Sequence, residues 1–406
     1  MTGGITRNLK FVDVWSLMDK TGADSLKLHE EYRGKIRTEV PFRIDSKRML
    51  SLAYTPGVAE VSRQLAEDPE KAYLYSIKSH TVAVVSDGSA VLGLGNIGPY
   101  GALPVMEGKA ALFKAFGDVD AFPICLDTQD PGEIIEICRK IAPAFGGINL
   151  EDIKAPHCFE IEDALQDLGI PVFHDDQHGT AVVVLAALMN ASKIVGKKIP
   201  EMSIVLCGAG AAGTAIAKML GLADKAGFPE LRPRNIIVCD SKGIISSERS
   251  DIDGTYKQAF LDYTNRDDVA GTLSDAVVGS DVFIGVSKAD LLTPPMVNTM
   301  VGDPIVFAMA NPDPEISYQA AQESKIAVFG TGRSDYPNQI NNVLAFPGIF
   351  RGALLARAKR ITLKMKLAAA MELAGSITPT EDQILPDPFE KSVHERIAHA
   401  VQKVEE

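Results

Sequence analysis

The first half of the chain repeats one pattern, in which an apolar run ends at an acidic residue and a helical stretch follows. Short apolar runs bounded by turn residues are typical of buried strands. Strands that alternate with helices predict a mostly parallel sheet, because each helix returns the chain to the edge where the previous strand began. The predicted strands are 81–85, 121–126, a run ending at 150, and 170–173, and they lead into Asp87, Asp127, Glu151-Asp152 and Asp175-Asp176.

Helices are predicted between these strands and toward both ends of the chain. The segment 178–195 is apolar on nearly all sides, which indicates a helix buried between domains. Residues 27–48 carry many charges and predict an extended or irregular arm. The other predicted helices are 15–29, 104–116, 131–141, 158–168, 348–360, 363–374 and 389–403.

A glycine fingerprint opens the second half of the chain. A predicted strand, 203–206, leads directly into GAGAAG, and a predicted helix, 214–220, follows. In this order the motif indicates a dinucleotide-binding turn, because glycines let the backbone approach the pyrophosphate and the helix N-terminus attracts its charge. The predicted cofactor-binding residues of this turn are Gly208, Ala209, Gly210, Ala211, Ala212 and Gly213.

An acidic residue, Asp240, follows the next predicted strand, 236–238. An acid at this place accepts hydrogen bonds from the adenosine ribose, so we expect a preference for NAD over NADP, whose 2′-phosphate it would repel. Lys242 and Arg249 are close enough in sequence to weaken that preference. Three further strands, 282–286, 305–309 and 326–329, end at Ser287, Asn311 and Gly330-Thr331-Gly332, which we expect to line the cofactor crevice.

A second match to the glycine pattern, GLGNIG at 93–98, is interpreted differently. Pro99, Gly101 and Pro104 follow at once, so we expect no helix N-terminus where a pyrophosphate would need one. We therefore predict a tight loop that approaches a substrate.

Together these elements predict an α/β protein with two domains and C-terminal helices. The first domain has a mostly parallel sheet, and the second is a Rossmann-type dinucleotide-binding domain. The predicted boundaries are 1–178 for the substrate and metal domain, 179–360 for the cofactor domain, and 361–406 for helices that pack back on the chain.

The two adjacent acidic pairs, Glu151-Asp152 and Asp175-Asp176, should meet at one edge of the first sheet, because consecutive parallel strands end there. Four carboxylates gathered in one place repel one another, so a hard divalent cation such as Mg²⁺ or Mn²⁺ is expected among them. Two alternatives remain open. The acids can be solvated loop ends, or His174, His178 and Cys158 can hold zinc.

Composition narrows the class of protein. The chain has 406 residues, 46% hydrophobic and 23% charged, as in ordinary globular enzymes, and a net charge of −12 argues against nucleic acid or an anionic membrane as partner. Five scattered cysteines fit reduced thiols in the cytoplasm better than a disulfide framework. The first residues, MTGGITRNLKF, have no apolar signal core, and the longest apolar run is too short to span a bilayer.

Two residues could move protons. Lys109 follows the GLGNIG loop and has small neighbours, Gly108 and Ala110, that leave room for a ligand. Tyr54 precedes the turn TPGV and could be a positioned phenol. The ordinary alternatives are a solvated lysine on a helix surface and a tyrosine that fills core or surface space.

Taken together, the motifs resemble the malic enzyme family in its compact bacterial form. They are YTPGV at 54, SDG and LGLGNIG within 86–98, PVMEGKA at 104, LED at 150, FHDDQHGT at 173, GAGAAG at 208, ANPDPE at 310 and NNVLAFPG at 341. They stand in family order and cover nearly the whole chain.

The resemblance implies oxidative decarboxylation of L-malate to pyruvate and CO₂ with NAD or NADP and with Mg²⁺ or Mn²⁺, in a homodimer. By motif position, Lys109 would take the C2 hydroxyl proton, Asp175 would pair with Lys109, and Tyr54 would protonate the enolate of pyruvate. The implied metal ligands are Glu151, Asp152 and Asp176, and the implied substrate contacts are Asn311 and one of Asn341 and Asn342, for which we favour Asn342.

One departure concerns the substrate carboxylate. Larger family members carry an Arg in the loop between SDG and LGLG, whereas this chain has Ser89-Ala90-Val91, so another group must hold the carboxylate. Two alternatives to the malic reaction remain, namely malolactic-type or oxaloacetate-decarboxylating activity on the same site, and a non-catalytic cofactor-sensing homologue.

Overall fold

The computed structural model describes residues 14–91 and 93–404, with side chains from residue 21 onward. The first thirteen residues, where the lack of a signal core was noted, lie outside the described residues. The chain forms two compact units, Met1–Arg43 and Ile44–Glu406. In the first unit, α1 (Val14–Tyr32) is a helix slightly longer than predicted, and irregular chain follows it.

The second unit contains a four-stranded sheet built from β1 (Thr81–Ser86), β2 (Asp120–Cys125), β3 (Gly147–Leu150) and β4 (Val172–His174). Its order is β2-β1-β3-β4, and every pair of neighbours is parallel, as the alternating pattern predicted. The register pairs Leu150 with His174, so β3 and β4 end side by side.

Helices cover both faces of this sheet because its strands are apolar on both sides. In β1, Val82 and Val84 face the large core shared with α5 (Gly98–Gly117) and α13 (Phe346–Ala356). Ala83 and Val85 face a separate core closed by α6 (Pro131–Ile141) and α7 (His157–Ala164).

The start of α5 corrects one expectation. This helix begins at Gly98, the last residue of GLGNIG, and not at residue 104, so the expected absence of a helix N-terminus there is wrong. Pro99 is tolerated because the first-turn N–H groups have no acceptor within the helix. The loop before the helix closes on the Gly88 carbonyl, which accepts from Ile97 N at 3.1 Å and Gly98 N at 3.2 Å. A side chain at Gly88 would collide with the Gly98 carbonyl.

A six-stranded sheet follows, with the order β10-β9-β8-β5-β6-β7. All its pairs are parallel except β6 with β7, the short antiparallel hairpin that the sequence did not predict. The strands are β5 (Ser203–Cys207), β6 (Asn235–Asp240), β7 (Gly243–Ile244), β8 (Val282–Gly285), β9 (Ile305–Ala308) and β10 (Val328–Thr331).

This second sheet is also covered on both faces. One face packs into the large shared core, toward α9 (Ala211–Gly221). The other face forms a core of its own with α10 (Leu273–Val277), α11 (Pro294–Thr299) and α12 (Tyr318–Gln322).

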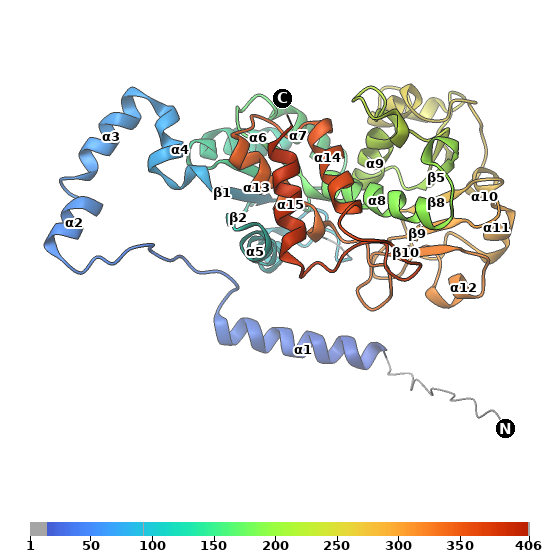
Figure 1. Ribbon diagram of the computed structural model, residues 1–406, viewed down its shortest axis with the longest axis horizontal. Coiled ribbons are helices and arrows are strands. Elements are labelled where there is room, and N and C mark those ends of the chain that lie inside the picture. Colours follow the sequence, from blue (N-terminus) through green and yellow to red (C-terminus); the bar gives the residue numbers. More distant parts are fainter. Residues whose placement is uncertain (1–13, 92, 405–406) are drawn as a thin grey trace. The chain divides into compact units, whose positions relative to one another are not determined.

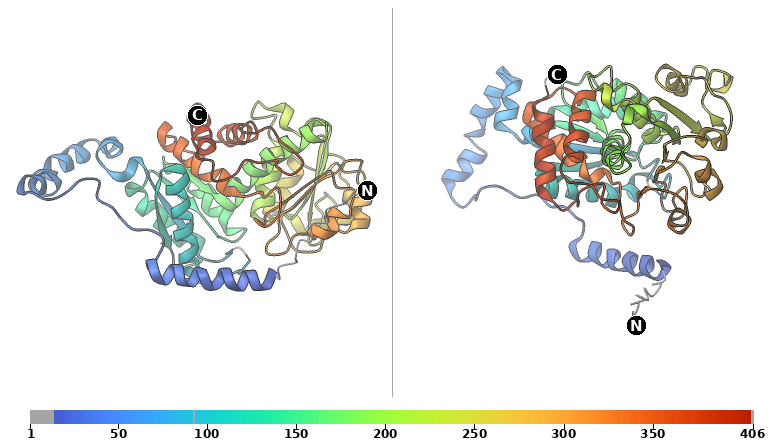
Figure 2. Two further views of the ribbon diagram at one scale, coloured as in Figure 1. Left: turned by 60° about the horizontal axis from the view of Figure 1, so that its bottom comes forward. Right: turned by 45° about the vertical axis from the view of Figure 1, so that its right-hand side comes forward.

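The long apolar helix α8 (Asp175–Ile194) is buried along most of its length, as predicted. It packs on α9 and on α14 (Leu363–Ala374), whose bounds match the prediction. Helix α15 (Lys391–Gln402) packs against α13 and α14, so the last helices return to the rest of the second unit (Figures 1 and 2). The domain boundaries at 178 and 360 stay predictions.

Three short helices between residues 47 and 75 were not predicted. They are α2 (Lys47–Ala53), α3 (Val58–Glu67) and α4 (Ala72–Tyr75), and none contains a buried residue. Among the described residues, no helix is both long and apolar enough to cross a membrane.

Candidate active site

Both acidic pairs lie at the carboxyl edge of the first sheet. Because Leu150 and His174 are register partners, the residues that follow them, Glu151 and Asp175, come next to one another. Asp175 and Asp176 form the first turn of α8 rather than a loop, where the helix dipole favours negative charge.

Glu151, Asp152 and Asp176 form a compact carboxylate group. One oxygen from each lies within 4.8 Å of the other two. Asp152 adopts a left-handed backbone conformation (φ 55°), which Asp tolerates better than most residues, and its N–H donates to Asp176 Oδ2 at 2.9 Å. Glu151 and Asp152 are buried, so the interpretation as solvated loop ends is wrong for them.

This carboxylate group suits a hard divalent cation. Burial raises the pKa of the Glu151 and Asp176 carboxyls, and their mutual repulsion adds to the effect at Glu151. A cation placed among them would relieve both the repulsion and the cost of burial. The ligand atoms are all oxygens, as Mg²⁺ and Mn²⁺ prefer. Within the described residues, His174, His178 and Cys158 do not form a three-ligand group close enough to hold zinc.

A second buried acid, Glu162 of α7, fixes the start of α8. Its carboxylate accepts from His174 N at 3.2 Å and Gln177 Nε2 at 3.0 Å, and lies 2.9 Å from His178 Nε2. Burial alone would raise the pKa of Glu162, but the charge and hydrogen bond of His178 lower it to about 2. Sequence reasoning missed this residue, because the segment around it reads as an ordinary amphipathic helix.

Lys109 lies at the centre of the site. Its Nζ is 2.6 Å from Asp175 Oδ2, 2.7 Å from Glu151 Oε1 and 4.2 Å from the centre of the Phe346 ring. Burial alone would lower the pKa of Lys109, but the carboxylates of Asp175 and Glu151 raise it instead. Lys109 therefore carries a proton here, and it neutralises part of the charge that a metal ion would neutralise.

Asn342 completes this arrangement from a third segment of the chain. Its Nδ2 donates to Asp175 Oδ2 at 2.7 Å, the oxygen that also contacts Lys109. Asn341 instead uses its side-chain oxygen to cap the next turn, by accepting from Val343 N. Of the two asparagines, Asn342 is the one whose amide reaches the acidic site.

Tyr54 is a predicted catalytic residue that the structure does not bring to this cluster. Its side chain is 70% exposed at the end of α2. Among the residues that the structure describes, it makes no side-chain hydrogen bond, ion pair or ring contact.

The glycine fingerprint forms a tight turn between β5 and α9. Gly208 has φ 124°, and a Cβ at Gly213 would lie 1.8 Å from the Gly208 carbonyl oxygen. Glycine is therefore required at both positions. The turn leads into the N-terminus of α9, as a dinucleotide pyrophosphate requires.

A residue that the sequence did not single out connects the ends of two further strands of the second sheet. Glu315, fully buried, accepts from Ser287 N at 2.8 Å and from Ala310 N at 3.1 Å, and so joins the ends of β8 and β9. Ser287 and Asn311 thereby lie at the carboxyl edge of the second sheet, as expected. The motif ANPDPE that contains Glu315 was the available signal.

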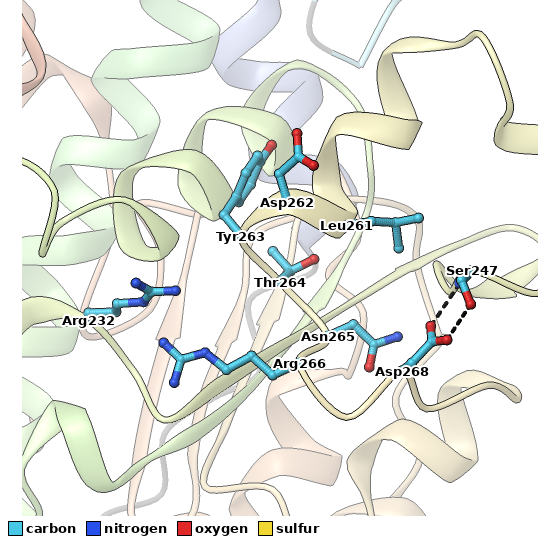
Figure 3. A pocket seen from close by; sticks show the side chains of 9 residues that line it. All are labelled: Arg232, Ser247, Leu261, Asp262, Tyr263, Thr264, Asn265, Arg266 and Asp268. Carbon is cyan, nitrogen blue, oxygen red and sulfur yellow. Dashed lines mark hydrogen bonds between the residues drawn. The ribbon is translucent and has the colours of Figure 1, made fainter.

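A hollow of about 340 Å³ lies elsewhere, lined by residues that include Arg232, Tyr263 and Arg266 (Figure 3). Neighbouring Asn265 N donates to Ile236 O at the start of β6. The hollow therefore lies near the amino end of this strand, whereas α/β sheets bind ligands at the carboxyl ends. It is not part of the candidate active site.

The fold and site define a class: an α/β protein with a Rossmann-type dinucleotide-binding sheet and a buried centre of lysine and carboxylates. The chain belongs to the malic enzyme family. Residues 33–166 match the model of the malic enzyme N-terminal domain, and residues 177–405 match that of the malic enzyme NAD binding domain.

Similar proteins carry several related names. The chain is 56% identical to the NAD-dependent malic enzyme of Geobacillus stearothermophilus, over 91% of this chain and 76% of that protein. It is 51% identical to the bifunctional malic/malolactic enzyme of Bacillus subtilis, over 94% and 92%. The crystal structure of the NAD-dependent malic enzyme from Thermotoga maritima is 49% identical, with a TM-score of 0.87, over 94% of this chain and 99% of that one.

Proposed function

We propose that this protein oxidises L-malate and decarboxylates it to pyruvate and CO₂, with NAD or NADP as hydride acceptor and Mg²⁺ or Mn²⁺ as metal. The observation that carries the proposal is the contact of buried Lys109 with Asp175 and with Glu151, which is one of three carboxylates suited to a cation. Family membership supports the same conclusion.

Glu151, Asp152 and Asp176 would hold the metal. The chemistry supplied when these groups are bound would be polarisation of the C2 oxygen and stabilisation of negative charge by the cation, and acceptance of the hydride by the dinucleotide. The side chains of this protein would position the substrate and transfer protons.

Lys109 is assigned the role of the base that removes the proton of the C2 hydroxyl. Its ammonium is held in place by Asp175 and by the face of the Phe346 ring, which limits its motion. To act as a base it must first lose its own proton. This becomes easier when positive charge enters the carboxylate group and cancels the field that keeps Lys109 protonated.

Substrate contacts are assigned to Asn342 and Asn311, whose amides can donate to the carboxylates of a dicarboxylic acid. The loop 89–91 has no cation, so these neutral donors would replace the Arg of larger relatives at Ala90. Neutral donors bind a carboxylate less strongly than a guanidinium does.

Tyr54 is assigned the return of a proton to C3, and we propose that it acts in a homodimer. Helices α2 and α3 bury no residue of their own and leave Leu50, Leu52 and Val58 substantially exposed. Short helices without a core are marginal unless they pack on something else. A second copy that covers this surface would bring Tyr54 to the partner's site.

The same site could perform malolactic chemistry, as the name of the Bacillus subtilis relative indicates for that protein. Product analysis separates the two reactions. Malate should yield pyruvate and one equivalent of reduced dinucleotide, whereas lactate without reduced dinucleotide would show malolactic activity. All five cysteines are free thiols, which supports a reducing cytoplasm as the location.

A further inference from the structure

Glu162 of α7 holds the chain on both sides of two site residues, Asp175 and Asp176. Its carboxylate accepts from the backbone N–H of His174, the residue directly before this pair, at 3.2 Å. It also accepts from Nε2 of Gln177, the residue directly after the pair, at 3.0 Å. The two acids therefore lie between two points that are bound to one side chain of another helix.

A third contact comes from the next residue of α8. His178 Nε2 lies 2.9 Å from a Glu162 carboxylate oxygen, and the His178 ring packs on the Phe173 ring with centroids 5.4 Å apart. Glu162, His174 and Gln177 are all buried. Loss of this carboxylate would leave buried donors without an acceptor, which is unfavourable.

A cation of α14 helps to keep Glu162 ionised. Lys366 Nζ lies 5.8 Å from the centre of the Phe173 ring, the ring on which His178 also packs. Burial alone would raise the pKa of Glu162, but His178 and, to a smaller extent, Lys366 lower it to about 2. An ionised carboxylate accepts at both oxygens, whereas a protonated one would present an O–H donor to the donors of α8. The charge of Glu162 is therefore part of what holds the start of α8.

The start of α8 is the part of that helix on which the site depends. Asp176 contributes one oxygen to the group that it forms with Glu151 and Asp152, whose oxygens all lie within 4.8 Å of one another. Asp175 Oδ2 lies 2.6 Å from Lys109 Nζ. A shift of this single helical turn would move one carboxylate out of the oxygen group and the other away from the lysine.

We propose that Glu162 is a positioning residue for the metal site, because its carboxylate holds the first turn of α8 where Asp176 meets Glu151 and Asp152. The proposal rests on the proposed function in that it takes these three carboxylates as the metal ligands. Glu162 is not one of them and acts only through the residues on either side of the acidic pair. Residues that orient metal ligands in such an indirect way typically account for about 10–100-fold in metal affinity.

The test is calorimetric titration of the full chain with Mn²⁺ and, separately, with NAD. Glu162→Gln keeps the shape of the side chain, but one accepting oxygen becomes an NH₂ group that faces the donors of His174 and α8. The variant should bind Mn²⁺ about tenfold more weakly or worse. It should bind NAD within about twofold of the wild type, because the glycine turn belongs to the other sheet.

Two further variants make the result specific. Glu160→Gln, at an exposed acid of the same helix, should bind Mn²⁺ and NAD as the wild type does. Gln177→Met keeps the length of the side chain and removes one of the donors to Glu162. It should also weaken Mn²⁺ binding with NAD binding retained, and it provides the test if Glu162→Gln folds poorly.

Two outcomes would overturn the proposal alone. One is equal Mn²⁺ affinity in Glu162→Gln and the wild type. The other is a parallel loss of Mn²⁺ and NAD binding, which would show that Glu162 supports the fold in general and not the metal site. A wild type that binds no Mn²⁺ would instead contradict the proposed function, and the role of Glu162 with it.

Discussion

The Nζ of Lys109 lies 2.6 Å from Oδ2 of Asp175, although 66 positions separate the two residues in sequence. The same oxygen accepts from Asn342, from a third part of the chain. Asp175 thus fixes a lysine of α5 and an asparagine beside α13 in relation to the carboxylates of Glu151, Asp152 and Asp176. This relationship supports the proposed role of Lys109 in the oxidation step, and that role is testable.

Replacing Lys109 by alanine should nearly abolish formation of reduced dinucleotide from malate. Loss of a general base typically costs about 10²–10⁴-fold in rate. The variant should keep more of the metal-dependent decarboxylation of added oxaloacetate, which needs no proton removed from C2. Lys114→Ala, at an exposed lysine of the same helix, is the matched control and should oxidise malate normally. Equal loss of both partial reactions would contradict this role.

Replacing Tyr54 by phenylalanine should slow the exchange of pyruvate methyl protons for deuterium more than it changes malate binding, because the ring stays and only the proton is lost. NMR follows the exchange directly. Tyr75→Phe, at another exposed tyrosine, should leave the exchange unchanged.

The dimer makes a separate prediction about Tyr54. If each subunit supplies Tyr54 to its partner, mixing and re-equilibrating Lys109→Ala with Tyr54→Phe should restore activity, because one site of each mixed dimer has both residues intact. If Tyr54 acts within its own chain, every mixed site lacks one of the two residues and no activity returns. Sedimentation analysis should confirm that the mixed species are dimers.

Metal binding should depend on pH through Glu151, whose pKa burial raises to about 7. As the pH falls from 8 to 6 this carboxyl takes up a proton, so Mn²⁺ must displace the proton and its apparent affinity should fall. Calorimetry in buffers of different ionisation enthalpy measures the protons released. If the Glu151→Gln variant releases as many protons on Mn²⁺ binding as the wild type does, another group is the source of those protons.

The raised pKa of Glu151 also predicts how the stability of the metal-free protein depends on pH. Between the unfolded pKa and the raised folded pKa, the native state binds more protons than the unfolded state, so this group's contribution to stability falls as the pH rises toward 8. Thermal unfolding in chelator should show that slope, and Glu151→Gln should reduce it. Added Mn²⁺ should stabilise the protein more at pH 8 than at pH 6.

Glu315 should matter for the cofactor crevice without contacting the reacting atoms. In Glu315→Gln one of the two accepting oxygens becomes a donor, which leaves the N–H of Ser287 or Ala310 unsatisfied in a buried place. The expected cost is about 1–3 kcal/mol in the free energy of unfolding, with a raised KM for the dinucleotide. Denaturant unfolding measures the first, and Glu323→Gln, at an exposed acid, should show neither effect.

The repeating strands and the glycine turn could be read from the sequence because their signals are local. An apolar run followed by an acid predicted β1, β3 and β4, and the acids were expected at one edge because parallel strands end together. The same local reasoning failed at α5, because Pro99 and Pro104 were taken as breaks. Pro99 lies in the first turn, which accepts proline, and Pro104 lies inside the helix.

The residues that the sequence did not reveal act through distant partners. Glu162 and Glu315 look like surface acids until the fold buries them against backbone N–H groups of other elements. Asp240 appeared free because Lys257, seventeen positions later, meets it only after the chain has turned back. Periodicity gives no information about such pairings, which depend on the assembled fold.

The central claim is that this site oxidises malate with the help of a metal, and absorbance at 340 nm tests it most directly. Purified protein with L-malate, Mn²⁺ and either NAD or NADP should show a steady rise in absorbance, matched by an equal amount of pyruvate. Chelation should abolish the rise while the circular dichroism spectrum stays unchanged, and excess Mn²⁺ should restore it. A rise that persists in excess chelator, or no rise with either dinucleotide when metal is present, would contradict the claim.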